Sequence, residues 1–314
     1  MRTSLVWMAG SIALVGAGFV GAQAPAPPAP GRVAVFKTGV DVVNLAVTVT
    51  DPKGRFVTDL AEGDFEVLEE GVRQPLTIFT REDLPVSLAI LIDTSASMDM
   101  KLGQAQTAAT RFVKTLLPAD EAQVVQFNQR AEVVQDFTSD KAQLETAIRS
   151  THASGDTALY TAIYVALKEL DRRHREDLRR RAVVVLTDGE DTASSVTDEQ
   201  VLDLAKRTGI GVYGVGLFGS DVPASARPLN PDQSTFFFSA LGRATGGQAH
   251  FLKAVSQLDG VYDRLAQELR SQYGLGYVSN NPAHDGRWRR VVVRTPRHLN
   301  LDLRHKLGYF APKN

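Results

Sequence analysis

The stretch VSLAILIDTSAS, residues 86–97, joins a nearly unbroken apolar run to a loop of oxygen-bearing side chains. Such a run indicates a strand that is buried on both faces. A second run, residues 182–186, passes through Thr187 into the loop DGED at 188–191. Between residues 84 and 272 these runs alternate with helical patterns, which predicts an α/β fold: a Rossmann-like, mostly parallel central sheet with helices on both faces. Helices are expected at 101–116, 140–149, 158–176, 197–207, 234–245 and 255–271, and strands at 86–92, 122–127, 181–187, 211–217 and 248–251.

Strand patterns of another kind flank this α/β region. Residues 43–50 alternate apolar and polar side chains, as expected of a half-buried strand. Similar short patterns occur at 65–68, 76–79, 273–278 and 287–294, and at the alternating leucines Leu299, Leu301 and Leu303. Two- or three-stranded pieces are marginal in water. We therefore predict that residues 33–82 and 273–311 pair into one small β-sandwich, into which the domain of residues 84–272 is inserted.

The N-terminal residues are typical of an export signal. Arg2 precedes an apolar stretch at 5–20, and small residues end at Ala22, so residues 1–22 are predicted to be a cleaved signal peptide. Residues 23–32 form an Ala/Pro linker. The alternative is an uncleaved anchor, because the apolar stretch approaches the minimum spanning length. We expect an exported protein, periplasmic or secreted, with no stable membrane span after cleavage.

The composition excludes several classes of function. The chain is 43% hydrophobic and 23% charged, with a formal net charge of -1 and no cysteine. Disulfides, thiolate metal sites and lipidated cysteines are therefore excluded. A balanced charge gives no general attraction to nucleic acid, so we expect no nucleic-acid partner.

Oxygen-bearing side chains gather where the predicted parallel strands end. Asp93 and Asp188 follow two of these strands, at the edge where open α/β sheets bind ligands. Ser95 and Ser97 alternate in the first loop, and Thr157 follows a glycine-containing turn just before a helix. Three hydroxyls and two carboxylates suit Mg²⁺ or Mn²⁺, with water or a partner carboxylate completing the shell. The alternative is ordinary turns, which use the same residue types.

The three motifs resemble the metal-ion-dependent adhesion site (MIDAS) of von Willebrand factor type A (VWA) domains. They are DTSASM at 93–98, the Thr157 loop and LTDG at 186–189. The resemblance covers residues 84–272, and the flanking segments are similar to those of exported bacterial VWFA-related proteins.

The resemblance implies a role for each residue of the site. Ser95 and Ser97 would bind the metal directly, Thr157 would do so in the ligand-occupied form, and Asp93 and Asp188 would act through bound waters. A Glu or Asp of a protein partner would complete the shell. The chain departs from the family pattern at Asp156, where glycine is common, and at Thr161, where an acidic residue is expected.

We therefore predict an exported, non-enzymatic, adhesion-type module that captures an acidic side chain through a divalent cation. Two alternatives remain open. One is a metal-assisted hydrolase that uses Asp93, Asp188 and a bound water, although no general base or second metal cluster is evident. The other is a structural envelope scaffold with a vestigial site.

One motif points to a nucleotide but lies in the wrong context. GIGVYG at 209–214 matches G-x-G-x-x-G. The dinucleotide motif follows a strand and opens a helix, whereas here a helix comes first and the glycines lie inside a predicted strand. We therefore expect no bound nucleotide, and interpret the glycines as allowing close packing.

Overall fold

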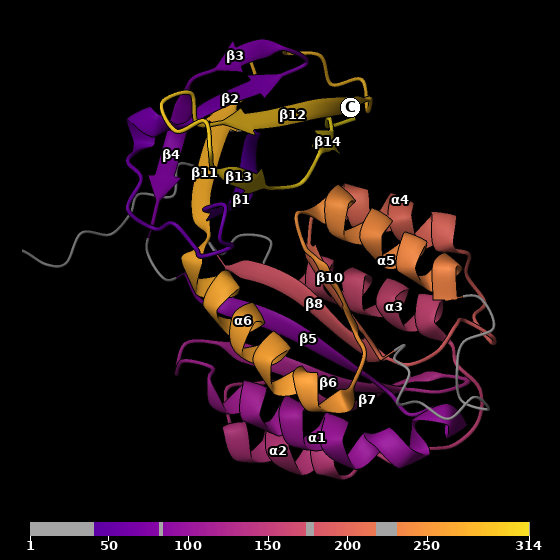
Figure 1. Cartoon of the computed structure of the whole chain (residues 1–314). Helices are drawn as coiled ribbons and strands as arrows, with labels where there is room; N and C mark the ends of the chain where they lie inside the picture. The colour runs from indigo at the N-terminus through magenta and orange to yellow at the C-terminus, as the bar shows by residue number, and fades with distance from the viewer. Residues whose placement is uncertain (1–40, 82–83, 174–178, 218–230, 314) are drawn as a thin grey trace, which may run out of the picture. The chain divides into compact units, whose positions relative to one another are not determined.

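The computed structural model describes residues 41–81, 84–173, 179–217 and 231–313 (Figure 1). The predicted signal peptide, residues 1–22, and linker, residues 23–32, lie outside this part of the chain. Among the described residues, no helix has the length and apolar character needed to cross a membrane.

A six-stranded sheet forms the centre of the α/β region, in the order β10-β9-β8-β5-β6-β7. Its strands are β5 (Val86–Asp93), β6 (Glu121–Phe127), β7 (Ala131–Thr138), β8 (Arg180–Thr187), β9 (Gly211–Leu217) and β10 (Ala249–Leu252). All neighbours are parallel except β6 and β7, which are antiparallel. Every residue of β5 is buried, as its apolar run predicts. The predicted mostly parallel sheet is confirmed.

Helices cover both faces of this sheet (Figure 1). One face carries α1 (Asp99–Lys114), α2 (Lys141–Arg149) and α6 (Leu258–Ser271), and the other carries α3 (Leu159–Arg172), α4 (Asp198–Thr208) and α5 (Pro231–Thr245). Along β5, Leu88 and Ile90 enter the core on the first face, and Ala89 and Leu91 the core on the second. This alternation places one strand between two apolar cores.

The glycine-rich stretch at 209–214 has a packing role. Gly209 ends α4 in the left-handed conformation, and Gly211 begins β9. A β-carbon on Gly214 would lie 2.3 Å from the Phe238 ring. Glycine at this position therefore lets α5 pack closely on β9, as predicted.

Strands from both ends of the chain build two further four-stranded sheets, β13-β1-β11-β4 and β14-β12-β2-β3. The strands are β1 (Val42–Thr50), β2 (Glu66–Glu69), β3 (Val72–Gln74), β4 (Leu76–Thr80), β11 (Tyr273–Val278), β12 (Trp288–Arg294), β13 (Asp302–Arg304) and β14 (Gly308–Phe310). β1 pairs with β11, and β2 pairs with β12, in both cases antiparallel. Residues of both sheets share one apolar core. Within the described residues, the predicted β-sandwich of N- and C-terminal segments is confirmed, whereas residues 33–40 and 82 of the predicted N-terminal segment lie outside them.

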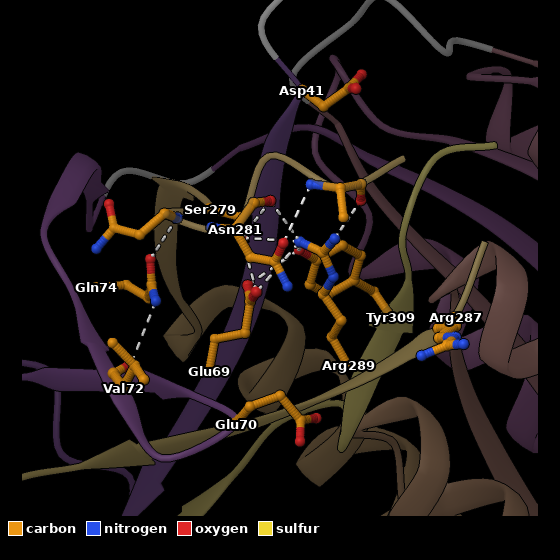
Figure 2. Close-up of polar contacts among 12 residues, drawn as sticks. Asp41, Glu69, Glu70, Val72, Gln74, Ser279, Asn281, Arg287, Arg289 and Tyr309 are labelled. Atoms are coloured by element: carbon orange, nitrogen blue, oxygen red, sulfur yellow. Dashed lines mark hydrogen bonds and ion pairs between the residues drawn. The ribbon is translucent and has the colours of Figure 1, made fainter. Parts of the chain in front are cut away.

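A buried charged cluster lies in this sandwich, which we name the Glu69 cluster: Glu69, Arg289, Tyr277, Ser279 and Tyr309. An Arg289 guanidinium nitrogen lies 3.3 Å from Glu69 Oε1, and both side chains are buried. The Ser279 hydroxyl donates to the same oxygen at 2.7 Å, while the Tyr277 and Tyr309 hydroxyls each donate to Oε2 at 3.0 Å. Figure 2 shows Ser279, Arg289 and Tyr309 directed toward the Glu69 carboxylate.

The strand predictions need correction, because β3, β7 and β14 were not predicted and one predicted strand is too long. β7 lies at the edge of the sheet, where half of its residues are polar and all of them are at least partly exposed. The strand predicted from Leu299 onward is shorter, because only Asp302–Arg304 pair with β1. Leu299 is 87% exposed, in a turn that the Leu301 amide closes by donating to the His298 carbonyl at 3.3 Å.

Candidate metal centre

Three loops meet at the carboxyl ends of β5 and β8. The first follows Asp93, the second contains Thr157 and the third begins at Asp188. The Ser154 amide donates to the Thr94 carbonyl at 2.7 Å, and the Ala96 amide donates to the Gly155 carbonyl at 3.0 Å. The Thr192 amide donates to the Thr157 carbonyl at 2.8 Å. Backbone hydrogen bonds therefore fix the second loop to both of the others.

The five predicted ligand residues come together where these loops meet. The Ser95 and Ser97 hydroxyl oxygens are 3.0 Å apart, and Ser97 donates to Asp188 Oδ1 at 2.8 Å. Asp93 Oδ1 accepts the Ser95 amide at 2.8 Å. A β-carbon placed on Gly189 would lie 3.7 Å from Thr157 Oγ1 and 3.9 Å from Ser97 Oγ, so these two hydroxyls face the same space. Their role as metal ligands stays a prediction.

Both carboxylates of the site are fully buried. Burial raises the pKa of Asp93 to about 6; hydrogen bonds from Thr187 and Ser95 act against this rise, and the nearby Asp188 charge adds to it. Loss of hydration disfavours an ionised carboxyl group, and a second carboxylate beside it does so further. An added cation would offset both effects.

Lys101 is a site residue that the sequence analysis missed. Its ammonium group donates to Asp188 Oδ2 and forms a buried ion pair, with the lysine 4% exposed. The signal available in the sequence is its spacing from Ser97, since four residues are about one helical turn. That signal is weak, because Ser97 lies in the 3-10 turn Ala96–Met98, before α1 begins at Asp99, two residues before the predicted start.

Thr187 was also not predicted as a functional residue. It is the last residue of β8, and its buried hydroxyl donates to Asp93 Oδ2. Asp191, in the third loop, accepts the Tyr160 amide at 3.1 Å and the Ser194 hydroxyl, so it fixes the start of α3. Asp156, which departs from the family pattern, is exposed.

The donor set fits a hard divalent cation. Within the described ranges, no group of three or more His, Cys, Asp or Glu side chains could hold a metal. The candidate centre instead combines three hydroxyls with two carboxylates, all of them oxygen donors. Mg²⁺ is commonly bound by one or two carboxylates while keeping several waters, and Mn²⁺ takes similar ligands. The Thr157 hydroxyl makes no hydrogen bond to the described part of the chain, which leaves it able to bind a ligand.

Comparison with known proteins gives one family match. Residues 88–190 match the family model for the von Willebrand factor type A domain. Inter-alpha-trypsin inhibitor heavy chain H4 of Sus scrofa is 25% identical over 211 residues, which are 63% of this chain and 22% of that protein. The chain thus spans about a fifth of the length of this curated relative.

Solved structures that are similar to this chain include the following two. A von Willebrand factor type A protein from Catenulispora acidiphila superposes with a TM-score of 0.52 at 13% identity, covering 88% of this chain and 76% of that one. Proximal thread matrix protein 1 of the mussel byssus, in a form with a zinc-occupied MIDAS motif, gives 0.49 at 15% identity, covering 64% of this chain and 49% of that one.

Proposed function

The chain contains a von Willebrand factor type A domain, and on that premise we propose that it is a metal-dependent protein-binding module of the adhesion type. In this proposal a divalent cation, Mg²⁺ or Mn²⁺, occupies the site formed by Asp93, Ser95, Ser97, Thr157 and Asp188. The partner is a protein that presents an exposed Glu or Asp.

One observation carries the proposal. Side chains from three separate loops bring hydroxyl and carboxylate oxygens to one place, where two aspartates are fully buried and only Asp188 is seen to pair with a lysine, the buried Lys101. Buried carboxylates are costly unless a cation or several hydrogen bonds compensate them. The second buried aspartate adds a further cost, which a bound divalent cation would offset.

Each residue has a distinct task in the proposed site. The hydroxyls of Ser95 and Ser97 would hold the metal directly, Thr157 would do so once the partner is bound, and the Asp93 and Asp188 carboxylates would orient the bound waters of the metal. A bound divalent cation would supply a positive centre to which a carboxylate of the partner can bind. Thr187 and the Ser95 amide hold the Asp93 carboxylate in place by hydrogen bonds, so the site is formed before the partner arrives.

We also propose that the protein acts outside the cytoplasm, in the periplasm or the medium. Support comes from the export pattern of residues 1–22. We expect no catalytic turnover. Ester and phosphate substrates should be hydrolysed at the same background rate with wild-type protein and with Asp93→Asn, both in the presence of Mg²⁺.

Metal and partner binding can be tested together. Wild-type protein, Asp93→Asn and the control Asp99→Ala would be titrated with Mn²⁺ by calorimetry and then used to retain proteins from the native envelope in Mg²⁺ or EDTA. Asp99 is exposed at the start of α1, next to the site. We expect Mn²⁺ binding and Mg²⁺-dependent retention by the wild type and the control only. Retention that is equally strong in EDTA, or with Asp93→Asn, would contradict the proposal.

A further inference from the structure

Lys101 occupies an unusual position for a lysine. It is the third residue of α1, so its positive charge lies close to the positive end of the helix dipole, where a cation is disfavoured. Its side chain is also almost completely buried, which is rare for lysine unless the ammonium is paired. Both costs indicate that the contact with Asp188 is what holds this ammonium in place.

The Lys101 contact competes with the proposed metal for the same carboxylate. Asp188 Oδ2 accepts the Lys101 ammonium, and Asp188 Oδ1 accepts the Ser97 hydroxyl. The metal-free chain therefore satisfies both Asp188 oxygens by itself, using one residue that would hold the metal directly. A metal that took Ser97 and reached Asp188 through water would have to disturb at least one of these hydrogen bonds.

We propose that Lys101 is an internal cation that stabilises the metal-free site and weakens metal binding. The inference rests on the proposed metal-dependent function and adds a regulatory residue to it. The side chains in the hydrogen-bonded site carry two formal negative charges, Asp93 and Asp188, and one positive charge, Lys101. Their net charge is therefore -1, and a bound divalent cation makes it +1.

The charge balance has two consequences. Lys101 and a bound cation repel each other within a site that is poorly screened by solvent, so metal affinity falls. The loaded site retains one uncompensated positive charge, so it favours an acidic partner over an empty ligand position. The site would thus hold metal firmly only when a carboxylate joins it.

Substitution of Lys101 separates its charge from its packing. Lys101→Met keeps an unbranched side chain of similar length and removes the charge, and Lys101→Gln keeps a hydrogen-bond donor with less effect on folding. The control is Lys114→Met, at the exposed end of the same helix, where Lys114 pairs with Glu145. The measurements are the Mn²⁺ dissociation constant by calorimetry and the melting temperature in EDTA and in saturating Mn²⁺.

We expect Lys101→Met to bind Mn²⁺ roughly tenfold more tightly than the wild type, because a hydrogen bond between charged groups contributes on that order. In EDTA the variant should melt below the wild type, and saturating Mn²⁺ should narrow the difference. Lys101→Gln should show the same tightening with a smaller loss of stability, and Lys114→Met should match the wild type in Mn²⁺ affinity.

The outcomes distinguish this inference from the proposed function. Unchanged or weaker Mn²⁺ affinity in folded Lys101→Gln, together with Mn²⁺ binding by the wild type, overturns the role of Lys101 and leaves the metal centre standing. Absence of Mn²⁺ binding in the wild type and in both Lys101 variants overturns both. Binding seen only after Lys101 is replaced supports the inference in its strongest form.

Discussion

Glu69 in the β-sandwich and Asp188 at the end of the central sheet are both buried carboxylates, and each faces a buried cation. Arg289, two tyrosine hydroxyls and a serine hydroxyl surround Glu69, and the cluster contains no second carboxylate. Among the described residues, only Ser97 and Lys101 donate side-chain hydrogen bonds to Asp188, and Asp93 lies nearby.

The difference between the two clusters separates a structural role from a binding role. The Glu69 cluster balances one negative charge with one positive charge, and its hydroxyls donate to Glu69, so there is little reason for an ion to bind. The site at Asp93 and Asp188 has a surplus of negative charge, and its Thr157 hydroxyl has no partner in the described part of the chain. A buried ion pair by itself therefore does not indicate a binding site; the uncompensated charge and the unused oxygen donor are what support the proposed binding role of the site at Asp93 and Asp188.

The largest effect on stability is expected from removing the Glu69 carboxylate. Glu69→Ala leaves the Arg289 charge buried without its carboxylate, which should lower the free energy of unfolding by about 3–5 kcal/mol. Urea unfolding in EDTA and in Mn²⁺ would measure this loss of stability, and Mn²⁺ should not restore it. The control is Glu66→Ala in the same strand, where a surface pair with Arg73 is expected to contribute less than about 1 kcal/mol. A loss no larger than that of the control would show that the Glu69 cluster is not a strong structural contact.

The next effect concerns the charge surplus and depends on pH. Burial raises the pKa of Asp93 from 3.8 to about 6 in the folded chain. Between these values the folded state keeps a proton that the unfolded state has lost, so metal-free stability falls as pH rises from about 4 to 6. At 1.36 kcal/mol per pKa unit, the loss amounts to about 3 kcal/mol by pH 6.5.

Asp93→Asn isolates this pH dependence, because the amide cannot titrate in this range. Urea unfolding in EDTA between pH 4 and 7 gives the stability of the wild type relative to the variant. The stability of the wild type relative to the variant should fall steadily up to about pH 6 and then stay constant. A difference in stability that stays constant across the whole pH range would mean that burial does not raise the pKa of Asp93.

The two clusters also differ in how far they can be predicted from sequence. Continuous apolar strands that end in Asp93 and Asp188 predict both the parallel sheet and the place where its loops meet, because both features depend on local pattern. The contacts of Lys101 and of Glu69 with Arg289 cannot be predicted in this way. Glu69 and Arg289 are 220 residues apart, and no local pattern indicates that they pair.

Edge elements escape prediction for a related reason. β7 borders the sheet on one side only, so its side chains show no continuous apolar run, and Val133 is 48% exposed. The alternating leucines near residue 300 give the opposite error, because Leu299 and Leu301 repeat at the spacing of a strand while the chain turns there. The alternation of apolar and polar residues indicates which side chains are buried only where the backbone forms a regular strand or helix. It does not apply where the chain turns.

A metal ion should stabilise one cluster and leave the other unchanged. At a free Mn²⁺ concentration one hundred times the dissociation constant, the wild type should gain about 2.7 kcal/mol of stability. Thr157→Val removes one proposed direct ligand. Loss of a contact to a metal site commonly raises the dissociation constant roughly tenfold. With that rise in the Mn²⁺ dissociation constant of Thr157→Val, the stability gained at the same Mn²⁺ concentration falls to about 1.4 kcal/mol.

Melting curves with and without Mn²⁺ would measure this gain for wild type, Thr157→Val and Thr146→Val. Thr146 is exposed on α2, away from the three loops, and serves as the matched control. Thr157→Val should change little in EDTA, because its hydroxyl makes no hydrogen bond within the described residues. An equal Mn²⁺ response in all three proteins would show that Thr157 does not hold the metal in the absence of a partner.

The smallest effect tests how completely Glu69 is satisfied. Tyr309 donates one of the four contacts that surround the Glu69 carboxylate, at 3.0 Å, and burial raises the pKa of its hydroxyl. Tyr309→Phe removes this donor while Arg289, Tyr277 and Ser279 remain, so the free energy of unfolding should fall by only about 1 kcal/mol. The change should be the same in EDTA and in Mn²⁺, as judged by urea unfolding. A loss of stability as large as that of Glu69→Ala would show that the other three donors do not hold the Glu69 carboxylate without Tyr309.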